Sequence, residues 1–316
     1  FRFEADNRWA QVPVEAAWQE AVGVAADSQG RVYVFNRGPL PIVILERDGS
    51  FVRSWGEGIV SDAHGICLDA QDNLFMVDRN AQVAVKFTAN GDKVFELGNR
   101  DQPSDSGWTD ESRTVLRAAD PFHHPTDIAL SANGDVYVSD GYRNARVHKY
   151  SDDGRLLFSW GEPGTGPGQF NVVHNIAADR DGNVYVADRD NRRVQVFDSN
   201  GNFLRVLVMN VPYPPDYQPP FTAVNPGRRV APATQPWSMC LTNGSPQELW
   251  VSDAEPGRIY RMTLDGKILG WLGSSGRQMG QFNWIHGLDC SQLDEGVLWV
   301  ADMNNWRVQK LIVDID

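Results

Sequence analysis

Three histidines occupy matching positions in a repeated sequence pattern, and they are the residues of this chain best suited to chemistry. They are His64, His174 and His286, out of six histidines in 316 residues. The lead-ins GQFNVVH (168–174) and GQFNWIH (280–286) are nearly identical. Neutral imidazole is a common metal ligand, so three of them converging from a rigid frame would hold a metal and leave a coordination position open. An open site of this kind is typical of a catalytic metal rather than a structural one.

The surrounding pattern is a long repeat of strand-like segments, which indicates a propeller or a solenoid. Its second strands read RVYVF (31–35), NLFMVD (73–78), DVYVSD (135–140), NVYVAD (183–188), ELWVSD (248–253) and VLWVAD (297–302). Polar turns such as SQG, ANG and RDG precede them, as expected for tight antiparallel hairpins. Third strands such as RRVQVF follow, and fourth strands such as FVRSWG end the copies.

Six copies of a four-stranded unit without a helical period predict an all-β chain, folded as a six-bladed β-propeller. The sixth copy stops after its third strand, so we expect an N-terminal strand from within residues 1–14 to close the ring. We expect a single domain over 1–316, with blades at about 15–56, 57–98, 122–161, 168–208, 235–273 and 280–316. Insertions at 99–121 and 209–234 should form long loops over one mouth, the second being rich in proline.

The histidines alternate around this predicted ring. Counting back from the polar residue that ends each second strand locates the start of each innermost strand. In blades one to six the residue there is Val22, His64, Thr126, His174, Trp237 and His286. Alternate blades of a six-fold ring would place the three imidazoles about 120° apart around the axis. The alternative is that each histidine is a hydrogen-bonded side chain that merely lines the channel.

The loops after the second strands should share one mouth with the histidines, because both lie at the same end of an antiparallel hairpin. They contain Arg37, Arg79, Tyr142 and Arg189. Arginine binds carboxylates with paired hydrogen bonds, and a tyrosine beside a cation and a metal can act as a general base. For Arg79 and Arg189 a structural role in a repeated Asp-Arg-x-Asn loop is the alternative. Arg37 stands in a loop that departs from that pattern.

Other polar residues are expected to be structural. Recurrence once per blade indicates a turn or capping role for five aspartates: Asp78, Asp140, Asp188, Asp253 and Asp302. We expect His123 and His124 to pack in a loop beside the mouth, and we assign no function to His148 on a third strand.

Composition excludes several classes of partner. The net charge of −12 disfavours nucleic acid and anionic membranes, which would repel the chain. No apolar run approaches the roughly 20 residues of a membrane span, so we expect no membrane insertion. The three cysteines are scattered and odd in number, which predicts no disulfide framework. Cys67 and Cys240 are expected to be buried thiols, and cysteine usage leaves the compartment open.

The repeat resembles NHL propellers. The stretch from HPTDIAL (124–130) through SDGYRNARVHKYS, GQFNVVHNIA and VADRDNRRVQVF (186–197) is similar to peptidyl-α-hydroxyglycine α-amidating lyases. In that family three histidines bind zinc, and His64 (HGICLD), His174 (VVHNIA) and His286 (WIHGLD) match them in motif. The family's active-site arginine falls on Arg37 and its catalytic tyrosine on Tyr142. Arg189 matches a further arginine near the site.

The resemblance implies zinc-dependent cleavage of an α-hydroxyglycine, on a small molecule or a peptide terminus, into an amide and glyoxylate. Tyr142 would take the hydroxyl proton and Arg37 would steer the carboxylate, while Arg79, Arg189 and Trp284 would contact substrate. Trp284 stands where the family has a methionine, so it would reshape the pocket. Gly287 stands where the family has an aspartate associated with calcium, so we do not expect that calcium. We also expect no counterpart of the family's disulfides.

Two other functions fit the same residues. A metal-dependent hydrolase or hydratase would use the three histidines to activate a water molecule. A propeller without enzymatic activity would serve as an interaction module, and the fold alone does not choose among these. An all-imidazole site also accepts copper, iron or nickel, so the prediction of zinc rests on the resemblance. The sequence names no protein partner.

Overall fold

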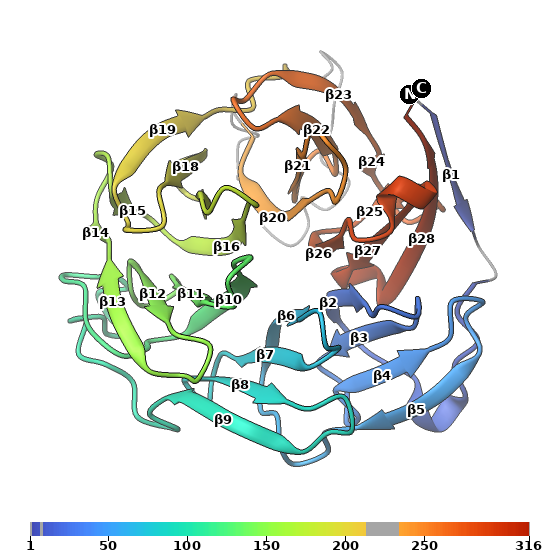
Figure 1. Ribbon diagram of the computed structural model, residues 1–316, viewed down its shortest axis with the longest axis horizontal. Coiled ribbons are helices and arrows are strands. Elements are labelled where there is room, and N and C mark those ends of the chain that lie inside the picture. Colours follow the sequence, from blue (N-terminus) through green and yellow to red (C-terminus); the bar gives the residue numbers. More distant parts are fainter. Residues whose placement is uncertain (1, 7–8, 213–233, 316) are drawn as a thin grey trace.

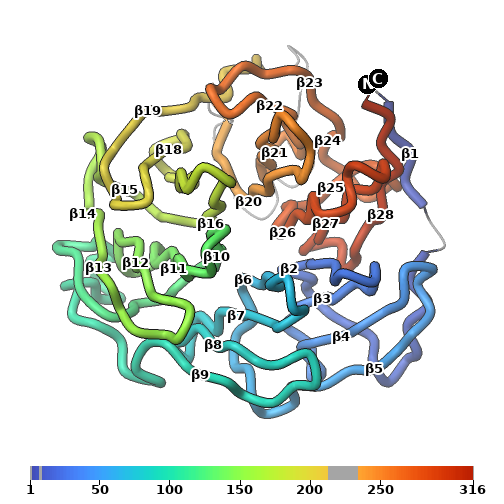
Figure 2. Tube along the Cα trace, in the orientation of Figure 1, coloured from blue at the N-terminus to red at the C-terminus, as the bar shows by residue number. Residues whose placement is uncertain are grey.

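The structure is a ring of six antiparallel sheets around a central axis (Figure 1), which confirms the predicted six-bladed β-propeller. It is a computed structural model, and it describes residues 2–6, 9–212 and 234–315. The chain runs around the ring one blade at a time, and its two ends lie side by side (Figure 2). Within the described residues only strands, turns and three short 3-10 helices occur: η1 (Val14–Ala16), η2 (Leu293–Glu295) and η3 (Met303–Asn305).

Each blade has four strands that follow one another from the axis outward. Blade one contains β2 (Ala21–Ala26), β3 (Val32–Asn36), β4 (Ile42–Leu45) and β5 (Phe51–Trp55). Blade two contains β6 (Ala63–Leu68), β7 (Leu74–Asp78), β8 (Val83–Phe87) and β9 (Lys93–Gly98). Blade three contains β10 (Pro125–Leu130), β11 (Val136–Asp140), β12 (Arg146–Tyr150) and β13 (Leu156–Trp160).

The other three blades follow the same plan. Blade four contains β16 (Val173–Ala178), β17 (Val184–Asp188), β18 (Arg193–Phe197) and β19 (Phe203–Leu207). Blade five contains β20 (Pro236–Leu241), β21 (Glu248–Asp253), β22 (Ile259–Thr263) and β23 (Ile268–Leu272). Blade six contains β26 (Ile285–Asp289), β27 (Val297–Asp302) and β28 (Arg307–Asp314). Two-residue parallel pairs, β14 (Glu162–Pro163) with β15 (Gln169–Phe170) and β24 (Ser274–Ser275) with β25 (Gln281–Phe282), precede blades four and six.

An N-terminal strand completes blade six, as the sequence predicts. β1 (Arg2–Asp6) pairs antiparallel with β28, with Phe3 opposite Val313 and Ala5 opposite Leu311. Phe3 and Ala5 also pack against the buried cluster between blades five and six. The pairing covers the edge that β28 would otherwise expose, so the ring closes through contacts between the two ends of the chain.

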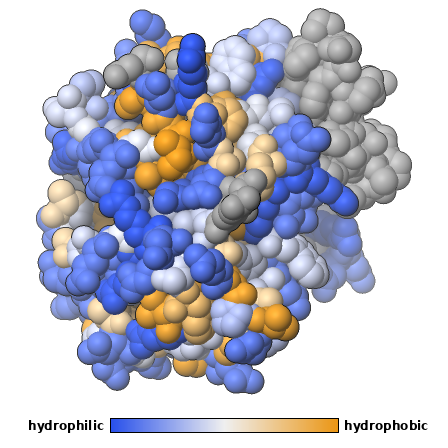
Figure 3. Space-filling model, turned by 90° about the vertical axis from the view of Figure 1, so that its right-hand side faces the viewer, coloured by the Kyte–Doolittle hydropathy of each residue, from blue (hydrophilic) through white to orange (hydrophobic). Residues whose placement is uncertain are grey.

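Burial explains why the second strands are the most regular part of the repeat. Every residue of β3, β7, β11 and β17 is buried, because blades pack on both faces of each sheet. Such strands favour β-branched and aromatic residues throughout rather than an alternation with polar ones. The outermost strands face solvent, and apolar residues such as Val52, Leu157 and Leu204 are exposed there. The side of the ring shown in Figure 3 is mostly hydrophilic, with separate apolar patches.

The first predicted insertion is a long loop. Residues 99–121 join β9 to β10 without a strand or helix. Trp108 of this loop stacks on the guanidinium of Arg143 at 3.7 Å, next in sequence to Tyr142. The loop therefore packs against the loop that contains Tyr142. The second predicted loop, 209–234, lies for the most part outside the described residues. The described part of the chain has no helix with the length and hydrophobicity that crossing a membrane requires.

The prediction that Cys240 is a thiol was wrong. Cys240 and Cys290 form a disulfide with a Cα–Cα distance of 5.6 Å, which joins β20 of blade five to the end of β26 of blade six. The two residues are 50 positions apart in sequence, and only the circular arrangement makes them neighbours. Cys67 is the free cysteine. Burial raises the pKa of its thiol well above the ordinary value, which disfavours the reactive thiolate.

We expect one free thiol per chain when the protein is denatured without reductant, because Cys240 and Cys290 are bonded to each other. Titration with a thiol reagent in guanidinium should reach three thiols only after reduction. The Cys240→Ser, Cys290→Ser variant should lose about 2–4 kcal/mol of unfolding free energy, since the bond constrains a long loop in the unfolded chain. A Cys67→Ser variant is the control and should leave no free thiol. Three thiols without reductant would contradict the assignment.

Candidate metal centre

The innermost strand of every blade has a β-bulge at the register predicted from sequence. In blades one, three, four and six the extra residue is Val22, Thr126, His174 and His286. In blades two and five one extra residue falls within 64–65 and 237–238. A bulge bends its strand and re-aims the side chain there, away from the faces that pack between blades. The repeated bulge thus gives each blade one residue at the same level of the axis.

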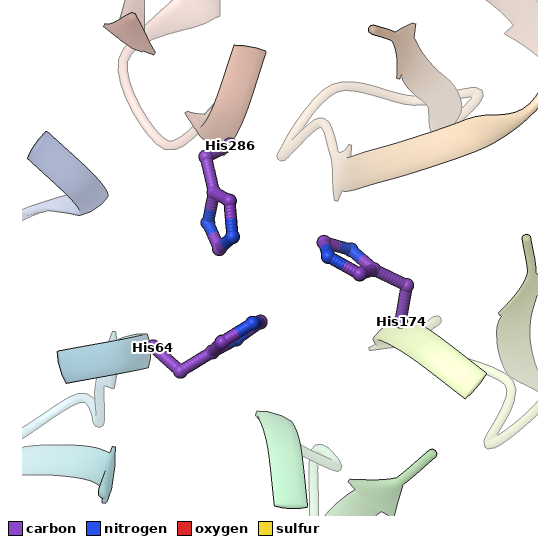
Figure 4. Close-up of side chains that lie close together, drawn as sticks. All are labelled: His64, His174 and His286. Atoms are coloured by element: carbon purple, nitrogen blue, oxygen red, sulfur yellow. The ribbon is translucent and has the colours of Figure 1, made fainter. Parts of the chain in front are cut away.

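The three histidines converge at the axis from alternate blades (Figure 4). Their ring centroids are 4.5 Å apart for His64 and His286, 5.1 Å for His174 and His286, and 5.2 Å for His64 and His174. One nitrogen of each ring lies within 4.8 Å of the others, and all three residues are buried. They form a group that could hold a metal ion, whereas the residues at this register in the other three blades offer no imidazole.

Hydrogen bonds between blades orient each imidazole. Nδ1 of His64 contacts the carbonyl of Thr126 at 2.5 Å, and Nδ1 of His174 contacts that of Trp237 at 2.6 Å. Nδ1 of His286 contacts the carbonyl of Val22 at 2.8 Å. Since a carbonyl only accepts, each Nδ1 must carry the proton, which leaves Nε2 unprotonated. A carbonyl that accepts from Nδ1 fixes the tautomer in which Nε2 can bind a metal, so the residues fit a transition-metal ion.

The imidazoles are held in the neutral form that a metal requires. Burial lowers the pKa of His64 and of His174 well below the ordinary value, and it lowers the pKa of His286 to about 3. Positive charge at the mouth adds to this effect: Arg37 lowers the pKa of His286, and Arg189 lowers that of His174. At neutral pH no proton competes with a metal for these nitrogens.

Tyr142 lies against the same nitrogens. Its hydroxyl is 3.0 Å from Nε2 of His174 and 3.3 Å from Nε2 of His64. Gly141 makes this placement possible, because a Cβ there would lie 2.0 Å from the carbonyl oxygen of Val173 in blade four. Only glycine lets the loop approach the neighbouring strand so closely, and the next side chain then reaches the axis.

The three predicted arginines stand at equivalent places around this mouth. The backbone N–H of Arg37, Arg79 and Arg189 donates to the carbonyl of Glu20, Asp62 and Val172, at 3.1, 3.0 and 3.0 Å. The guanidinium carbons of Arg79 and Arg189 are 5.1 and 5.4 Å from the centre of the Tyr142 ring. Arg37 instead bonds Glu20 at 2.9 Å and Asp62 at 3.0 Å. The geometry brings all of the predicted mouth residues around the histidines.

Two tryptophans line one side of the mouth. Trp284 lies 5.2 Å from Trp237, and Trp237 lies 4.8 Å from His174, between ring centroids. The guanidinium of Arg189 lies 4.5 Å from the Trp237 ring. Sequence reasoning assigned a substrate contact to Trp284 but not to Trp237. The sequence did contain a sign that Trp237 lies at the site. It is a bulky aromatic residue at the position that holds histidine in alternate blades.

The residues expected to be structural make hydrogen bonds to backbone groups or to side chains of loops and outer strands. The recurrent aspartates accept backbone N–H groups from the loop before the inner strand or after the second strand, as Asp78 does from Ser61 at 2.6 Å and Asp302 from Asn283 at 2.7 Å. His123 contacts the hydroxyl of Ser106 at 3.0 Å in the first long loop. His148 lies between Ser159 and Asp140, at 2.9 and 3.4 Å, on a strand away from the axis.

A cavity of about 340 Å³ lies along the inner strands and reaches the three histidines. Asp127, Asp289 and Gly287 are among the residues that line it. Neither Tyr142 nor Arg37 of the mouth lines it. Gly287 is tightly enclosed, since a Cβ there would lie 2.9 Å from the Cα of Gly23. An aspartate would not fit at 287 without a shift of backbone. The expectation that this chain binds no calcium here stays a prediction.

The sequence similarity agrees with the resemblance of the motifs. A family model described as NHL repeat matches residues 122–150 and 170–197. NHL repeat-containing protein 3 of Homo sapiens is 35% identical over 189 residues, 56% of this chain and 51% of that protein. Peptidyl-alpha-hydroxyglycine alpha-amidating lyase 1 of Drosophila melanogaster is 26% identical over 293 residues, 87% of this chain and 50% of that protein. The chain thus spans about half the length of these curated relatives.

Solved structures share the fold. A structure described as streptogramin B lyase superimposes with a TM-score of 0.62 and covers 99% of this chain and 98% of its own. The sequence identity is 14%, so the similarity concerns the propeller architecture alone.

We expect the metal-free protein to lose stability in acid through its buried histidines. The folded-state pKa of His286 is about 3, below the value of about 6.5 of an unfolded chain. The unfolded chain therefore binds more protons in that window, and stability falls as pH drops through it, by about 1.4 kcal/mol per pH unit for each such histidine. Urea unfolding of chelated protein should show a smaller loss between pH 6.5 and 4.5 in His286→Gln.

The control is His148→Gln, because its shift has the opposite sign. Burial lowers the pKa of His148, but bonds to Asp120 and Asp140 outweigh burial and raise it. Its contribution is complete below the unfolded-state pKa of about 6.5 and is lost as pH rises through the folded-state pKa, so His148→Gln should leave the acid loss between pH 6.5 and 4.5 close to that of wild type. Equal acid losses in wild type and His286→Gln would contradict a neutral, buried His286.

Proposed function

We propose that this chain is a zinc-dependent lyase that cleaves an α-hydroxyglycine, or a close carbinolamine analogue, into an amide and glyoxylate. One observation carries the proposal: the Tyr142 hydroxyl lies at hydrogen-bonding distance from the axial nitrogens of two of the three converging histidines. The similarity to a protein named as an amidating lyase, over 87% of this chain, supports the same reaction. The substrate is a small molecule or the terminus of a peptide.

The residues of the mouth have complementary tasks in this reaction. His64, His174 and His286 would hold the metal, which supplies Lewis acidity toward a substrate oxygen when bound. Arg37, with Arg79 and Arg189, binds the substrate carboxylate through charge-assisted hydrogen bonds. Trp284 and Trp237 exclude water on one side and contact the remainder of the substrate.

Tyr142 is the base. Its phenolic oxygen takes the proton of the substrate hydroxyl, and the C–N bond breaks as the C–O double bond of glyoxylate forms. The departing nitrogen receives a proton and becomes the amide, so the atoms balance without an added oxidant or water.

One observation favours a non-catalytic propeller as a second candidate. The human relative at 35% identity is named for its repeats alone. In that case the histidines would be side chains bonded to neighbouring blades, without a metal. Metal content separates the two candidates, and release of glyoxylate separates the lyase from a hydrolase or hydratase at the same site.

We expect about one zinc per chain in protein purified without metal-affinity resin, measured by mass spectrometry. His174→Ala should lose that metal, because two nitrogens hold a divalent ion far less tightly than three. His148→Gln is the matched control: it replaces a buried histidine with the residue found at the same place in blades four and six, Gln195 and Gln309, and should keep the metal. No stoichiometric metal, with no rebinding of zinc, would favour the interaction module.

Tyr142→Phe should lower the rate of glyoxylate release from a peptidyl α-hydroxyglycine by about 100-fold or more, the usual contribution of a general base. Zinc content should not change, since the variant keeps the ring and all three histidines. Tyr150→Phe serves as the control, because its buried hydroxyl has no hydrogen-bond partner among the described residues. Full turnover in Tyr142→Phe would refute the assignment of the base.

A further inference from the structure

Asp62 joins two arginines of the mouth. One carboxylate oxygen, Oδ1, forms an ion pair with Nε of Arg37 at 3.0 Å. The other, Oδ2, accepts a hydrogen bond from Nε of Arg79 at 2.7 Å and lies 2.5 Å from its Nη2. The Asp62 side chain is 7% exposed, whereas those of Arg37 and Arg79 are 22% and 25% exposed. A single buried carboxylate therefore sets the direction of two guanidinium groups that come from different blades.

This arrangement leaves one edge of each guanidinium available. Nε of Arg37 faces Asp62 and donates to the carbonyl of Ala63 at 3.2 Å, and Nη1 donates to Glu20 at 2.9 Å. Arg79 uses Nε and Nη2 for Asp62. Within the described residues Nη2 of Arg37 and Nη1 of Arg79 make no protein hydrogen bond. Two fixed donors from adjacent blades can bind one carboxylate, because a carboxylate accepts from two donors at once.

The acidic residue is specific to this part of the ring. Asp62 lies two residues before His64, which occupies the bulged position of its inner strand. The equivalent residue in blade one is also an acid, Glu20. The other four blades have His124, Val172, Gln235 and Trp284 there. A residue needed for the blade itself would recur, as the second-strand aspartates do. Asp62 departs from the repeat at the same place as the arginines that it contacts.

We propose that Asp62 is a positioning residue that holds Arg37 and Arg79 as one rigid pair, and that this pair gives the site its selectivity for substrates with a carboxylate. The inference rests on the proposed lyase function. Its physical basis is preorganisation, since long arginine side chains lose rotamer freedom before the substrate arrives rather than when it binds. Asp62 itself does not touch substrate in this scheme.

The discriminating variant is Asp62→Asn, which keeps the volume but loses the charge and one acceptor. Nδ2 of an asparagine would face an arginine donor, so one of the two arginines would be released. With a peptidyl α-hydroxyglycine we expect KM to rise by about 10-fold or more while kcat changes by less than about threefold, as for a lost ground-state contact. Zinc content and the thermal midpoint should stay close to wild type. Asp62→Glu, which keeps the charge, should recover part of the loss.

Two controls separate positioning from a merely structural role. Glu20→Gln removes an acid that contacts Arg37 alone and should raise KM by less than Asp62→Asn. Glu248→Gln breaks a comparable ion pair with Arg261, away from the mouth, and should leave KM unchanged. An unchanged KM in folded Asp62→Asn, or an equal rise in Glu248→Gln, would overturn the proposal. Should Asp62→Asn not fold, the same comparison is made with Asp62→Ser, which also removes the charge, and a KM equal to wild type would overturn it.

Binding of glycolate, the simplest α-hydroxy carboxylate, provides a readout without turnover. Calorimetry on the zinc-loaded protein should show binding by wild type and a loss of about 10-fold in affinity in Asp62→Asn. If wild type binds glycolate but releases no glyoxylate from the peptide, the lyase function is refuted. The comparison of glycolate affinity between wild type and Asp62→Asn then still tests the role of Asp62. Equal binding by wild type and Asp62→Asn would refute the role of Asp62 but leave the lyase intact. No binding by wild type would overturn the proposed carboxylate site as well.

Discussion

The hydrogen bond from each axial imidazole to the carbonyl of the next blade is the interaction on which the site depends. It requires a donor in one blade and a free carbonyl in the next, at the same level of the axis. The β-bulge satisfies both conditions, since it turns one residue of each inner strand out of the regular ladder. Histidine blades and carbonyl blades therefore alternate, and a six-fold scaffold produces a three-fold site.

The space at the axis is too small for a histidine at this position in all six blades. The three rings are already 4.5–5.2 Å apart between centroids, so three more imidazoles at this level would overlap with them. The intervening positions can then diverge, and they have done so. Val22 contributes a backbone acceptor, Thr126 donates its hydroxyl to the carbonyl of Val173 at 2.8 Å, and Trp237 adds an aromatic wall. The scaffold thus keeps one register constant while three of its side chains remain open to change.

The fold and the central group of the site were predictable from the sequence because both depend on periodicity. Strand order, the closing N-terminal strand and the alternation of His64, His174 and His286 follow from counting along the repeat. Tyr142 was predictable for a related reason: it stands in a loop whose place relative to the register is the same in every blade. The bulge itself was not anticipated, since one extra residue in a strand leaves no clear mark on an alternating pattern that is buried on both faces.

Contacts between different blades were harder to predict. The disulfide between Cys240 and Cys290 and the ion pair between Asp62 and Arg37 join neighbouring blades, and the equivalent residues of the other blades do not make such contacts. Neither follows from the repeat, because a repeat describes what all copies share. An odd cysteine count argued against a disulfide framework but said nothing about a single bond between neighbouring blades.

Departures from the repeat are where function is best sought in this chain. Each aspartate that recurs at the end of a second strand holds backbone groups of its own blade, and its role is explained by that blade alone. Asp62, Tyr142 and Gly141 have no such recurrence, and each contacts an atom from another blade or makes such a contact possible. A propeller gains little stability from a unique residue where a repeated one would pack equally well. The unique residues at the mouth are therefore better explained by what the mouth binds than by what holds the ring together.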